Sequence, residues 1–459
     1  MTVIKLPDTF IKKYRQLMGD EADDFLAALQ GDSYSGFRIN PLKNGRPTQT
    51  LEKAAGPVPG VATGFYGSVD GKSLDHVTGW VYSQEPSAMQ VGEVVDPQPG
   101  EKVLDLCAAP GGKSTHLIGK MHDQGLLVAN EIFTKRARVL ASNLERWGTA
   151  NTVVANEEPQ KLVPKFAGFF DRILVDAPCS GEGMFRKDPQ AISYWNPDYP
   201  SECANRQRKI LASAMQMLKP GGVLVYSTCT FAPEEDEQNM AWLLKEYPDL
   251  RMLPIPLVDG MDHARPEWAD NNPELAKAVR LFPHHFKGEG HFIAKLQLST
   301  AAATTRPKRK KKKRRGQEPW QVSRDEQQLF KQWQTKNVPD FAERRLVKFG
   351  DQLYALPDQM IDLSGLDLIS PGLHLGTFKK KRFEPALAWA LTLTSSEVKR
   401  QIELTPDQWR QYVHGDVVNV SDSFAGNGWY LLTCEGHSCG WGKLVNHTIK
   451  NFFPKGLRF

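Results

Sequence analysis

The sequence of 459 residues lacks the long apolar runs that cross membranes. Hydrophobic residues make up 40% of it, the mean hydropathy is −0.45, and no stretch approaches the roughly 18 consecutive apolar residues of a membrane span. Its first residues carry charges in every turn and have no apolar core of the kind that marks a secretory signal. We therefore expect a cytoplasmic protein with no membrane partner.

Cysteine is scarce as well. The chain has six cysteines, and no two of them form a Cys-x-x-Cys pair. This excludes a disulfide framework and disfavours a redox pair. Cys434, His437 and Cys439 stand close together in CEGHSC, but no second pair of ligands follows at the spacing of a zinc site. We therefore expect no bound metal.

Basic charge is concentrated in one segment. The net charge is +5, and the run RPKRKKKKRR at 306–315 alone holds nine basic residues, so removing them leaves −4. Such a run cannot pack, which predicts a linker between a long front part and a C-terminal part. It could be a solubilising spacer, attract a polyanion by neutralising phosphates, or carry a nuclear localisation signal.

The front part repeats one unit, in which an apolar run is followed by turn residues and a helical pattern. Ala137, Leu140 and Leu144 recur at helical spacing between two of these runs. Alternating strands and helices predict βαβ units and a mostly parallel, doubly wound sheet, whose ligands bind beyond the carboxyl ends of the strands. The expected strands span 102–108, 126–131, 151–156, 171–178 and 222–229.

A glycine-rich loop follows the first of these strands, in DLCAAPGGKSTHLIGK at 105–120. Gly111 and Gly112 let the backbone approach a ligand, and a helix starting near Lys113 would aim free N–H groups at it. The loop is neither GxGxxG nor a P-loop, which disfavours NAD and ATP. Glu131 ends the next strand, where a carboxylate can hold a ribose. The pattern predicts an adenosine cofactor, with a structural turn and a chance surface glutamate as the alternative.

Two further strands end in a cysteine, in DAPCSGEG (176–183) and YSTCTFAPEEDE (226–237). Cysteines at strand ends are commonly small buried hydrophobes. Two thiols at neighbouring strand ends would also suit methylation of a pyrimidine at carbon 5. One thiolate adds to carbon 6 so that carbon 5 can attack the methyl group of S-adenosylmethionine, and the other assists breakdown of the adduct. Asp176 could donate to, or hydrogen bond with, ring N3 if its pKa is raised.

These motifs carry a family resemblance. VLDLCAAPGGKSTHL, DAPCSGEGMFRKDP and YSTCTFAPEEDE, in this order, closely resemble the Sun-family RNA cytosine-5 methyltransferases. The chain looks like the RsmF-type branch, which methylates 16S rRNA. FRINPLK, YSQEPSAMQ, GLHLGTFKKKRFEPALAWAL and GWGKLVNHTIKNFFPKGLRF also match that branch, so the resemblance covers nearly the whole sequence.

The resemblance implies a role for each matching residue. The nucleophile falls on Cys229, the thiol that helps to release the product on Cys179, the ring-facing acid on Asp176 and the ribose-binding acid on Glu131. Many relatives carry Asp-Gly after the third strand as an adenine contact, whereas this chain reads ANEEP, where Asn156 or Glu158 would substitute. The cofactor loop falls on Cys107, Ala108, Ala109, Pro110, Gly111, Gly112 and Lys113.

The resemblance also implies the organisation of the chain. We expect an α/β fold with a Rossmann-like, S-adenosylmethionine-dependent methyltransferase domain, an N-terminal α/β RNA-binding appendage and a C-terminal PUA-like, β-rich domain. The expected boundaries are an N-terminal RNA-binding segment at 1–85, the methyltransferase domain at 86–298, the basic linker at 299–318, an intermediate α/β module at 319–390 and the PUA-like domain at 391–459.

The implied function is methylation of carbon 5 of cytosine in 16S rRNA, free or in the 30S subunit, without an obligate protein partner. Two alternatives also act on RNA, namely a tRNA cytosine-5 methyltransferase and a non-catalytic RNA-binding ribosome assembly factor. A third, unrelated to RNA, is an NAD-linked oxidoreductase. The missing GxGxxG disfavours the last of these.

Several basic and aromatic residues are candidate RNA contacts. Arg38, Lys43 and Arg46 could touch a phosphate backbone or lie in a solvated loop, and the basic cluster at 379–382 is a better candidate. Aromatic side chains could stack on unpaired bases, although in a short β-rich domain they more often form its core. The aromatic residues concerned are Trp429, Tyr430 and Trp441.

Overall fold

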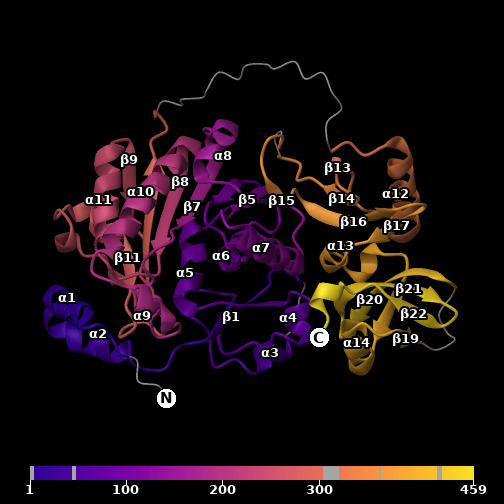
Figure 1. The fold of residues 1–459 in the computed structure, drawn as a ribbon, viewed down its shortest axis with the longest axis horizontal. Coiled ribbons are helices and arrows are strands. Elements are labelled where there is room, and N and C mark those ends of the chain that lie inside the picture. Colours follow the sequence, from indigo (N-terminus) through magenta and orange to yellow (C-terminus); the bar gives the residue numbers. More distant parts are fainter. Residues whose placement is uncertain (1–4, 44–47, 303–319, 361–362, 421–425) are drawn as a thin grey trace.

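A computed structural model describes residues 5–43, 48–302, 320–360, 363–420 and 426–459, and Figure 1 shows their arrangement. The basic run at 306–315 and Arg46 lie outside the described residues, so their predicted roles remain predictions. No helix in the described ranges combines the length and the apolar character needed to cross a membrane.

A ten-stranded sheet forms the centre of the molecule (Figure 1). Five adjacent parallel strands confirm the predicted doubly wound sheet, and an antiparallel strand follows β8. The order along the sheet is β10 (Asp262–His263), β11 (Val279–Leu281), β12 (His291–Leu298), β8 (Leu218–Thr228), β7 (Phe170–Asp176), β4 (Lys102–Asp105), β5 (Leu126–Asn130), β6 (Thr152–Ala155) and β15 (Leu368–Ser370), and β9 (Leu250–Leu253) pairs with β12.

Helices cover both faces of this sheet. Successive side chains of each strand point to opposite faces, so each strand contributes to two buried clusters. Val103 and Leu127 belong to one buried cluster and Leu104 and Val128 to another. The first cluster also receives side chains from α5 (Pro86–Val95) and α6 (Gly112–Lys120), and Trp147 of α7 (Thr134–Trp147); the second receives them from α8 (Pro159–Phe166), α10 (Tyr199–Met217) and α11 (Glu237–Glu246).

The N-terminal segment is held against the central domain by aromatic side chains. Phe10 and Tyr14 of α1 and Phe25 of α2 form one buried cluster with aromatic residues from the central domain, including Phe231 and Phe282. The elements of this segment are α1 (Asp8–Met18), α2 (Ala22–Ala28), β1 (Gly36–Ile39), α3 (Gln49–Glu52), β2 (Gly64–Tyr66), α4 (Leu74–Val77) and β3 (Val81–Ser83), with the strands paired in the order β2-β1-β3.

The part after the basic run contains two smaller sheets. Trp429, Tyr430 and Trp441 are buried in it, which confirms that they form core and do not offer free stacking faces. The first sheet has the order β13 (Leu346–Phe349), β14 (Gln352–Ala355), β16 (Leu373–Lys379), β17 (Arg382–Pro385), next to α12 (Arg324–Asn337) and α13 (Leu387–Thr392); the second has β18 (Gln401–Leu404), β20 (Gly428–Cys434), β21 (His437–Val445), β22 (Thr448–Asn451), β19 (Val418–Asn419), with α14 (Pro406–His414).

One strand from this C-terminal part joins the central sheet. β15 pairs antiparallel with β6, with Leu368 opposite Ala155. The pattern of the sequence gives no sign of this pairing, because a three-residue strand carries too little periodicity to be recognised.

Candidate active site

The candidate site lies at the carboxyl ends of β4, β5, β7 and β8, as predicted for a doubly wound sheet. Strand order reverses next to β4, whose neighbours are β5 and β7. The loops after β4 and β5 therefore lie on one side of this switch point, and the loops after β7 and β8 lie on the other. The first pair carries the predicted cofactor residues, and the second pair carries the two predicted thiols.

The glycine loop turns from β4 into α6. Gly111 adopts a φ of 114°, in the left-handed region that favours glycine, and it caps the N-terminus of α6. A Cβ atom on Gly111 would lie 3.1 Å from the Leu140 side chain. A larger residue would therefore strain the loop both through its backbone conformation and through this contact. The N–H groups of the first turn of α6 are consequently available to a ligand.

Asp105 holds this loop through a hydrogen bond with α6. Its side chain is fully buried and accepts a hydrogen bond of 2.7 Å from Ser114. Burial, reinforced by the nearby Asp176, raises the pKa of Asp105 to about 7 despite that hydrogen bond. Burial and the neighbouring carboxylates, Asp105 first among them, also raise the pKa of Cys107, which disfavours its thiolate form.

Glu131 lies at the end of β5 with its side chain almost fully buried. Its carboxylate accepts a hydrogen bond of 2.9 Å from the main-chain N–H of Phe133 and lies 3.3 Å from Arg136. Arg136 also donates to the carbonyl of Ala109 at 2.9 Å, which ties the glycine loop to the loop after β5. The structure thus brings Glu131 and the glycine loop together as predicted.

Asn156 follows β6 and points at the loop after β5. Its side-chain amide donates to the carbonyls of Glu131 at 2.7 Å and of Ile132 at 3.0 Å, and its amide oxygen accepts from Thr134 at 2.8 Å. Every polar atom of this side chain is thereby engaged. Asn156 supports the loop that carries Glu131, whereas Glu158 is exposed.

Lys113 and Asp176 form an ion pair that spans the switch point, with Nζ and Oδ2 2.8 Å apart. The other carboxylate oxygen of Asp176 accepts a hydrogen bond of 2.8 Å from Ser227. Burial alone would lower the pKa of Lys113, but the charge and hydrogen bond of Asp176, with a contribution from Cys229, raise it. The ion pair with Asp176 therefore favours the charged form of Lys113.

The two thiols meet at the ends of β7 and β8. The sulfur atoms of Cys179 and Cys229 are 3.3 Å apart, and both residues are half-buried. The hydrogen bond to Cys229, together with burial and the charge of Glu235, raises the pKa of Cys179 well above its ordinary value. The raised pKa favours the thiol form of Cys179, within hydrogen-bonding distance of the Cys229 sulfur.

Two buried carboxylates hold the thiol loops, and sequence reasoning missed both. Glu235 accepts hydrogen bonds from the main-chain N–H of Ser180 at 3.0 Å and from Gln207 at 2.7 Å. Glu182, also fully buried, accepts four hydrogen bonds, from Tyr14 at 2.5 Å, Trp195 at 2.9 Å, Thr230 at 3.1 Å and the N–H of Phe231 at 3.2 Å. For Glu235 the acidic run in APEEDE is the available signal, and Glu182 belongs to the motif DAPCSGEG, but the burial of both depends on residues far away in sequence.

Comparison with known proteins identifies the family. The family model described as 16S rRNA methyltransferase RsmB/F matches residues 93–297. The chain is 32% identical over 475 residues to ribosomal RNA small subunit methyltransferase F of Aliivibrio fischeri strain MJ11, covering 99% of this chain and 98% of that protein. The chain belongs to the RsmB/F family of 16S rRNA methyltransferases.

Further similarities extend over the rest of the chain. The protein of the same name from Escherichia coli K12 is 31% identical over 476 residues, covering 99% of this chain and 97% of that one. A crystal structure of a methyltransferase homolog protein from Pyrococcus horikoshii has 31% identity and a TM-score of 0.57, covering 64% of this chain and 96% of that chain. Models of the RsmF N-terminal domain, first C-terminal domain and PUA domain match residues 6–86, 330–393 and 399–459.

In this RsmB/F-family chain, the prediction that Arg38 contacts phosphate or solvent is wrong. Arg38 is fully buried, and its guanidinium donates to Gln84 at 2.5 Å, to the carbonyl of Gly112 at 2.6 Å and to Thr115 at 2.7 Å. The N-terminal segment thereby braces the first turn of α6. Lys43 is half-buried and donates to the carbonyl of Leu391, so it joins the N-terminal segment to the C-terminal part.

The residues of CEGHSC do not converge on one point. Cys434 and Cys439 lie in the apolar core of the PUA domain. His437 instead stacks on Trp80 with ring centroids 4.2 Å apart and lies 3.3 Å from Thr78. Within the described ranges, no three His, Cys, Asp or Glu side chains are arranged to hold a metal ion.

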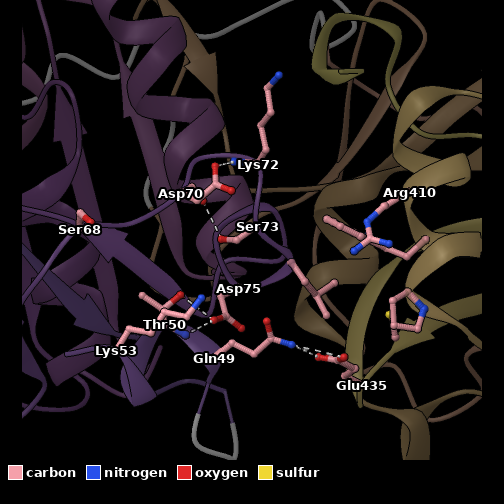
Figure 2. A pocket seen from close by; sticks show the side chains of 14 residues that line it. Gln49, Thr50, Lys53, Ser68, Asp70, Lys72, Ser73, Asp75, Arg410 and Glu435 are labelled. Atoms are coloured by element: carbon pink, nitrogen blue, oxygen red, sulfur yellow. Dashed lines mark hydrogen bonds between the residues drawn. The ribbon is translucent and has the colours of Figure 1, made fainter.

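A cavity of about 440 Å³ lies between the N-terminal segment and the PUA domain, and neither Cys179 nor Cys229 lines it (Figure 2). Gln49 on one wall donates to Glu435 on the other at 3.2 Å. Asp75 is buried and accepts from the main chain and the hydroxyl of Thr50 at 2.9 and 2.7 Å. Both cations and carboxylates line this cavity, and none of the predicted site residues does.

Proposed function

We propose that this chain methylates carbon 5 of a cytosine in 16S rRNA, with S-adenosylmethionine as the methyl donor and with Cys229 as a covalent nucleophile. The observation that carries the proposal is the pair of sulfur atoms 3.3 Å apart, at the same sheet edge as the glycine loop and Glu131. A Rossmann-like methyltransferase fold alone would support many acceptors, whereas two adjacent thiols beside it suit nucleophilic addition to a pyrimidine ring.

The residues present fit an adenosine-containing methyl donor. Glu131 is a buried carboxylate whose Oε2 lies 3.3 Å from Arg136, and a carboxylate at this place suits the hydroxyl pair of a ribose. The loop from Cys107 to Lys113 offers main-chain N–H groups and a glycine at the point of closest approach. Bound there, S-adenosylmethionine would supply the methyl group that carbon 5 takes up.

The two thiols have separate roles because their surroundings differ. Cys229 interacts electrostatically with the Lys113 ammonium. Cys179 keeps its proton, since hydrogen bonding to Cys229 and burial raise its pKa. The Cys229 sulfur adds to carbon 6 of cytosine, and carbon 5 then takes up the methyl group. Elimination removes the carbon 5 proton, its electron pair re-forms the double bond between carbons 5 and 6, and the carbon 6–sulfur bond breaks. Cys179 assists this step as a proton relay, because it protonates the departing Cys229 sulfur and takes up the carbon 5 proton in its place.

Asp176 orients the ring during this addition. Its carboxylate is fixed from two directions, by Lys113 at 2.8 Å and by Ser227 at 2.8 Å, so it enters the reaction already positioned. With a proton shared between its carboxyl group and ring N3, Asp176 would hydrogen bond to N3 of cytosine, where negative charge accumulates when the thiolate adds. The Lys113 cation limits the cost of placing a carboxylate beside that charge.

The substrate is 16S rRNA, free or within the 30S subunit. The target base must leave its stack to reach Cys229, and this costs a few kcal/mol, least in single-stranded or distorted RNA. The PUA domain and the exposed basic cluster at 379–382, in the turn between β16 and β17, provide RNA contacts outside the site. The protein acts in the cytoplasm, where ribosomal subunits are assembled.

Methyl transfer from labelled S-adenosylmethionine to purified 16S rRNA, 30S particles and tRNA tests the proposal. We expect label in 16S rRNA or 30S particles, and nuclease digestion followed by mass spectrometry should place it in 5-methylcytidine. Label only in tRNA would overturn the substrate, and label in another nucleoside would overturn the chemistry. Absence of transfer to all three acceptors, with retained RNA binding, would support a non-catalytic assembly factor instead.

A further inference from the structure

The outermost strand next to the cofactor loops comes from the C-terminal part of the chain. β15 pairs with β6 so that Leu368 lies opposite Ala155 and Ser370 opposite Val154. Because the two strands run antiparallel, the start of β15 lies at the carboxyl end of β6. This is the edge of the sheet at which the glycine loop and Glu131 also lie.

Asp367, immediately before β15, makes two main-chain hydrogen bonds at this edge. Its carbonyl accepts from the N–H of Asn156 at 2.9 Å, and its N–H donates to a carboxylate oxygen of Glu157 at 2.8 Å. Glu157 is buried, and its other oxygen is 3.5 Å from Lys161, which is exposed. A hydrogen bond to a buried carboxylate is stronger than one between neutral groups.

The two partners of Asp367 in turn hold the end of β5. Asn156 donates to the carbonyl of Glu131 at 2.7 Å. Glu157 exchanges main-chain hydrogen bonds with the Asn130 side chain, at 2.9 Å to its carbonyl and 3.1 Å from its N–H. A continuous set of hydrogen bonds therefore runs from the C-terminal part, through Asn156 and Glu157, to the residue proposed to hold the ribose.

An apolar contact reinforces this connection. Ile369 packs against the small buried cluster that contains Ala108 and Ala109 of the cofactor loop, together with Val154 of β6. The C-terminal strand thus supports the loops on both sides of the cofactor position, one through hydrogen bonds and the other through packing.

We propose that residues 366–370 are a positioning element of the methyl-donor site, so that the affinity for the donor depends on docking of the C-terminal part. The inference rests on the proposed function, because it takes Glu131 as the ribose-binding residue. Linkage makes the dependence reciprocal: donor binding must strengthen the docking of β15 by the same factor. The enzyme would then hold its RNA-binding module most firmly when it is loaded with donor.

The hydrogen bond between Asp367 and Glu157 can be removed from either side in the full-length chain. Asp367→Pro deletes the N–H donor, and Glu157→Ala deletes the acceptor while leaving the main-chain bonds to Asn130. We expect each change to raise KM for S-adenosylmethionine about 10-fold with kcat at saturation nearly unchanged. The KM of the double variant should be no higher than that of either single variant, because both changes remove the same hydrogen bond. Asp367→Ala, which retains the N–H, should recover most of the affinity, and Lys161→Ala serves as the matched control.

Hydrogen exchange provides a second measurement that does not depend on a proline variant folding. Saturating S-adenosylmethionine should slow amide exchange over 366–370 in the wild-type chain, whereas the β16–β17 turn at 379–382 should be unaffected. Equal KM values in wild type, Asp367→Pro and Glu157→Ala, or no protection of 366–370, would overturn the inference. If wild type does not bind S-adenosylmethionine, or if Glu131→Ala binds it equally well, the proposed function itself fails.

Discussion

The sulfur atoms of Cys179 and Cys229 lie 3.3 Å apart, although 50 positions separate the two residues in sequence. Parallel pairing of β7 with β8 places Asp176 opposite Ser227, so both cysteines follow within three residues of one register pair. Adjacent parallel strands end at the same edge of the sheet, and this geometry converts two distant motifs into one site.

Replacing Lys113 by methionine should slow catalysis. The change removes the cation beside Cys229 and leaves the Asp176 carboxylate without its partner, so we expect kcat to fall about 100-fold in steady-state methyl transfer. Lys120→Met, at the other end of α6, is the matched control, since Lys120 pairs with Glu93 instead. A kcat for Lys113→Met within twofold of that of Lys120→Met would contradict the role given to this ion pair.

Glu182→Ala should destabilise the fold, because four donors lose their acceptor in a fully buried place. We expect the free energy of unfolding in urea to decrease by roughly 3 to 5 kcal/mol, and Tyr14→Phe to cost about 1 kcal/mol. Glu234→Ala, which affects a partly exposed glutamate paired with Lys13, should have a small effect. Equal stabilities of the Glu182 and Glu234 variants would show that the buried carboxylate is dispensable.

Glu235 should give the protein a measurable pH dependence. Burial, together with the charge of Glu182, raises its pKa from 4.5 to about 8. A carboxyl whose pKa is raised on folding stabilises the native state fully below its unfolded pKa, and this contribution is lost as pH rises through the folded pKa. Glu235→Gln mimics the protonated form and serves as the reference. Relative to this variant, the free energy of unfolding of the wild type should decrease by up to about 1.4 kcal/mol per pH unit between about pH 5 and about pH 8.

Urea unfolding of wild type and Glu235→Gln across that range checks this prediction, with Glu234→Gln as a control for the loss of one charge. A difference between wild type and Glu235→Gln that stays constant from about pH 5 to about pH 8 would exclude a raised pKa at Glu235.

Local patterns predicted the parts of the molecule that local physics determines. The periodicity of Ala137, Leu140 and Leu144 predicts a helix, and α7 spans Thr134–Trp147. The apolar run near 102–108 predicts a buried strand, and β4 spans Lys102–Asp105. Both depend only on side chains that are neighbours in the sequence.

Contacts between distant segments could not be predicted in this way. Arg38 lies in a polar stretch rich in turn residues, yet it is buried because Gln84, Gly112 and Thr115 supply acceptors from distant segments. The pairing of β15 with β6 likewise joins strands more than two hundred residues apart. The motifs locate the candidate site, but the hydrogen bonds that hold it come from elsewhere in the chain.

The most direct test of the account is to measure covalent protein–RNA adducts in Cys179→Ala and Cys229→Ala side by side. Each variant is incubated with 16S rRNA and S-adenosylmethionine, separated under denaturing conditions, and the modified peptide is located by mass spectrometry. We expect the adduct to accumulate in Cys179→Ala, attached at Cys229, and to be absent from Cys229→Ala and from the double variant. An adduct that forms in Cys229→Ala, or one that disappears in Cys179→Ala, would contradict the assignment of the two thiols.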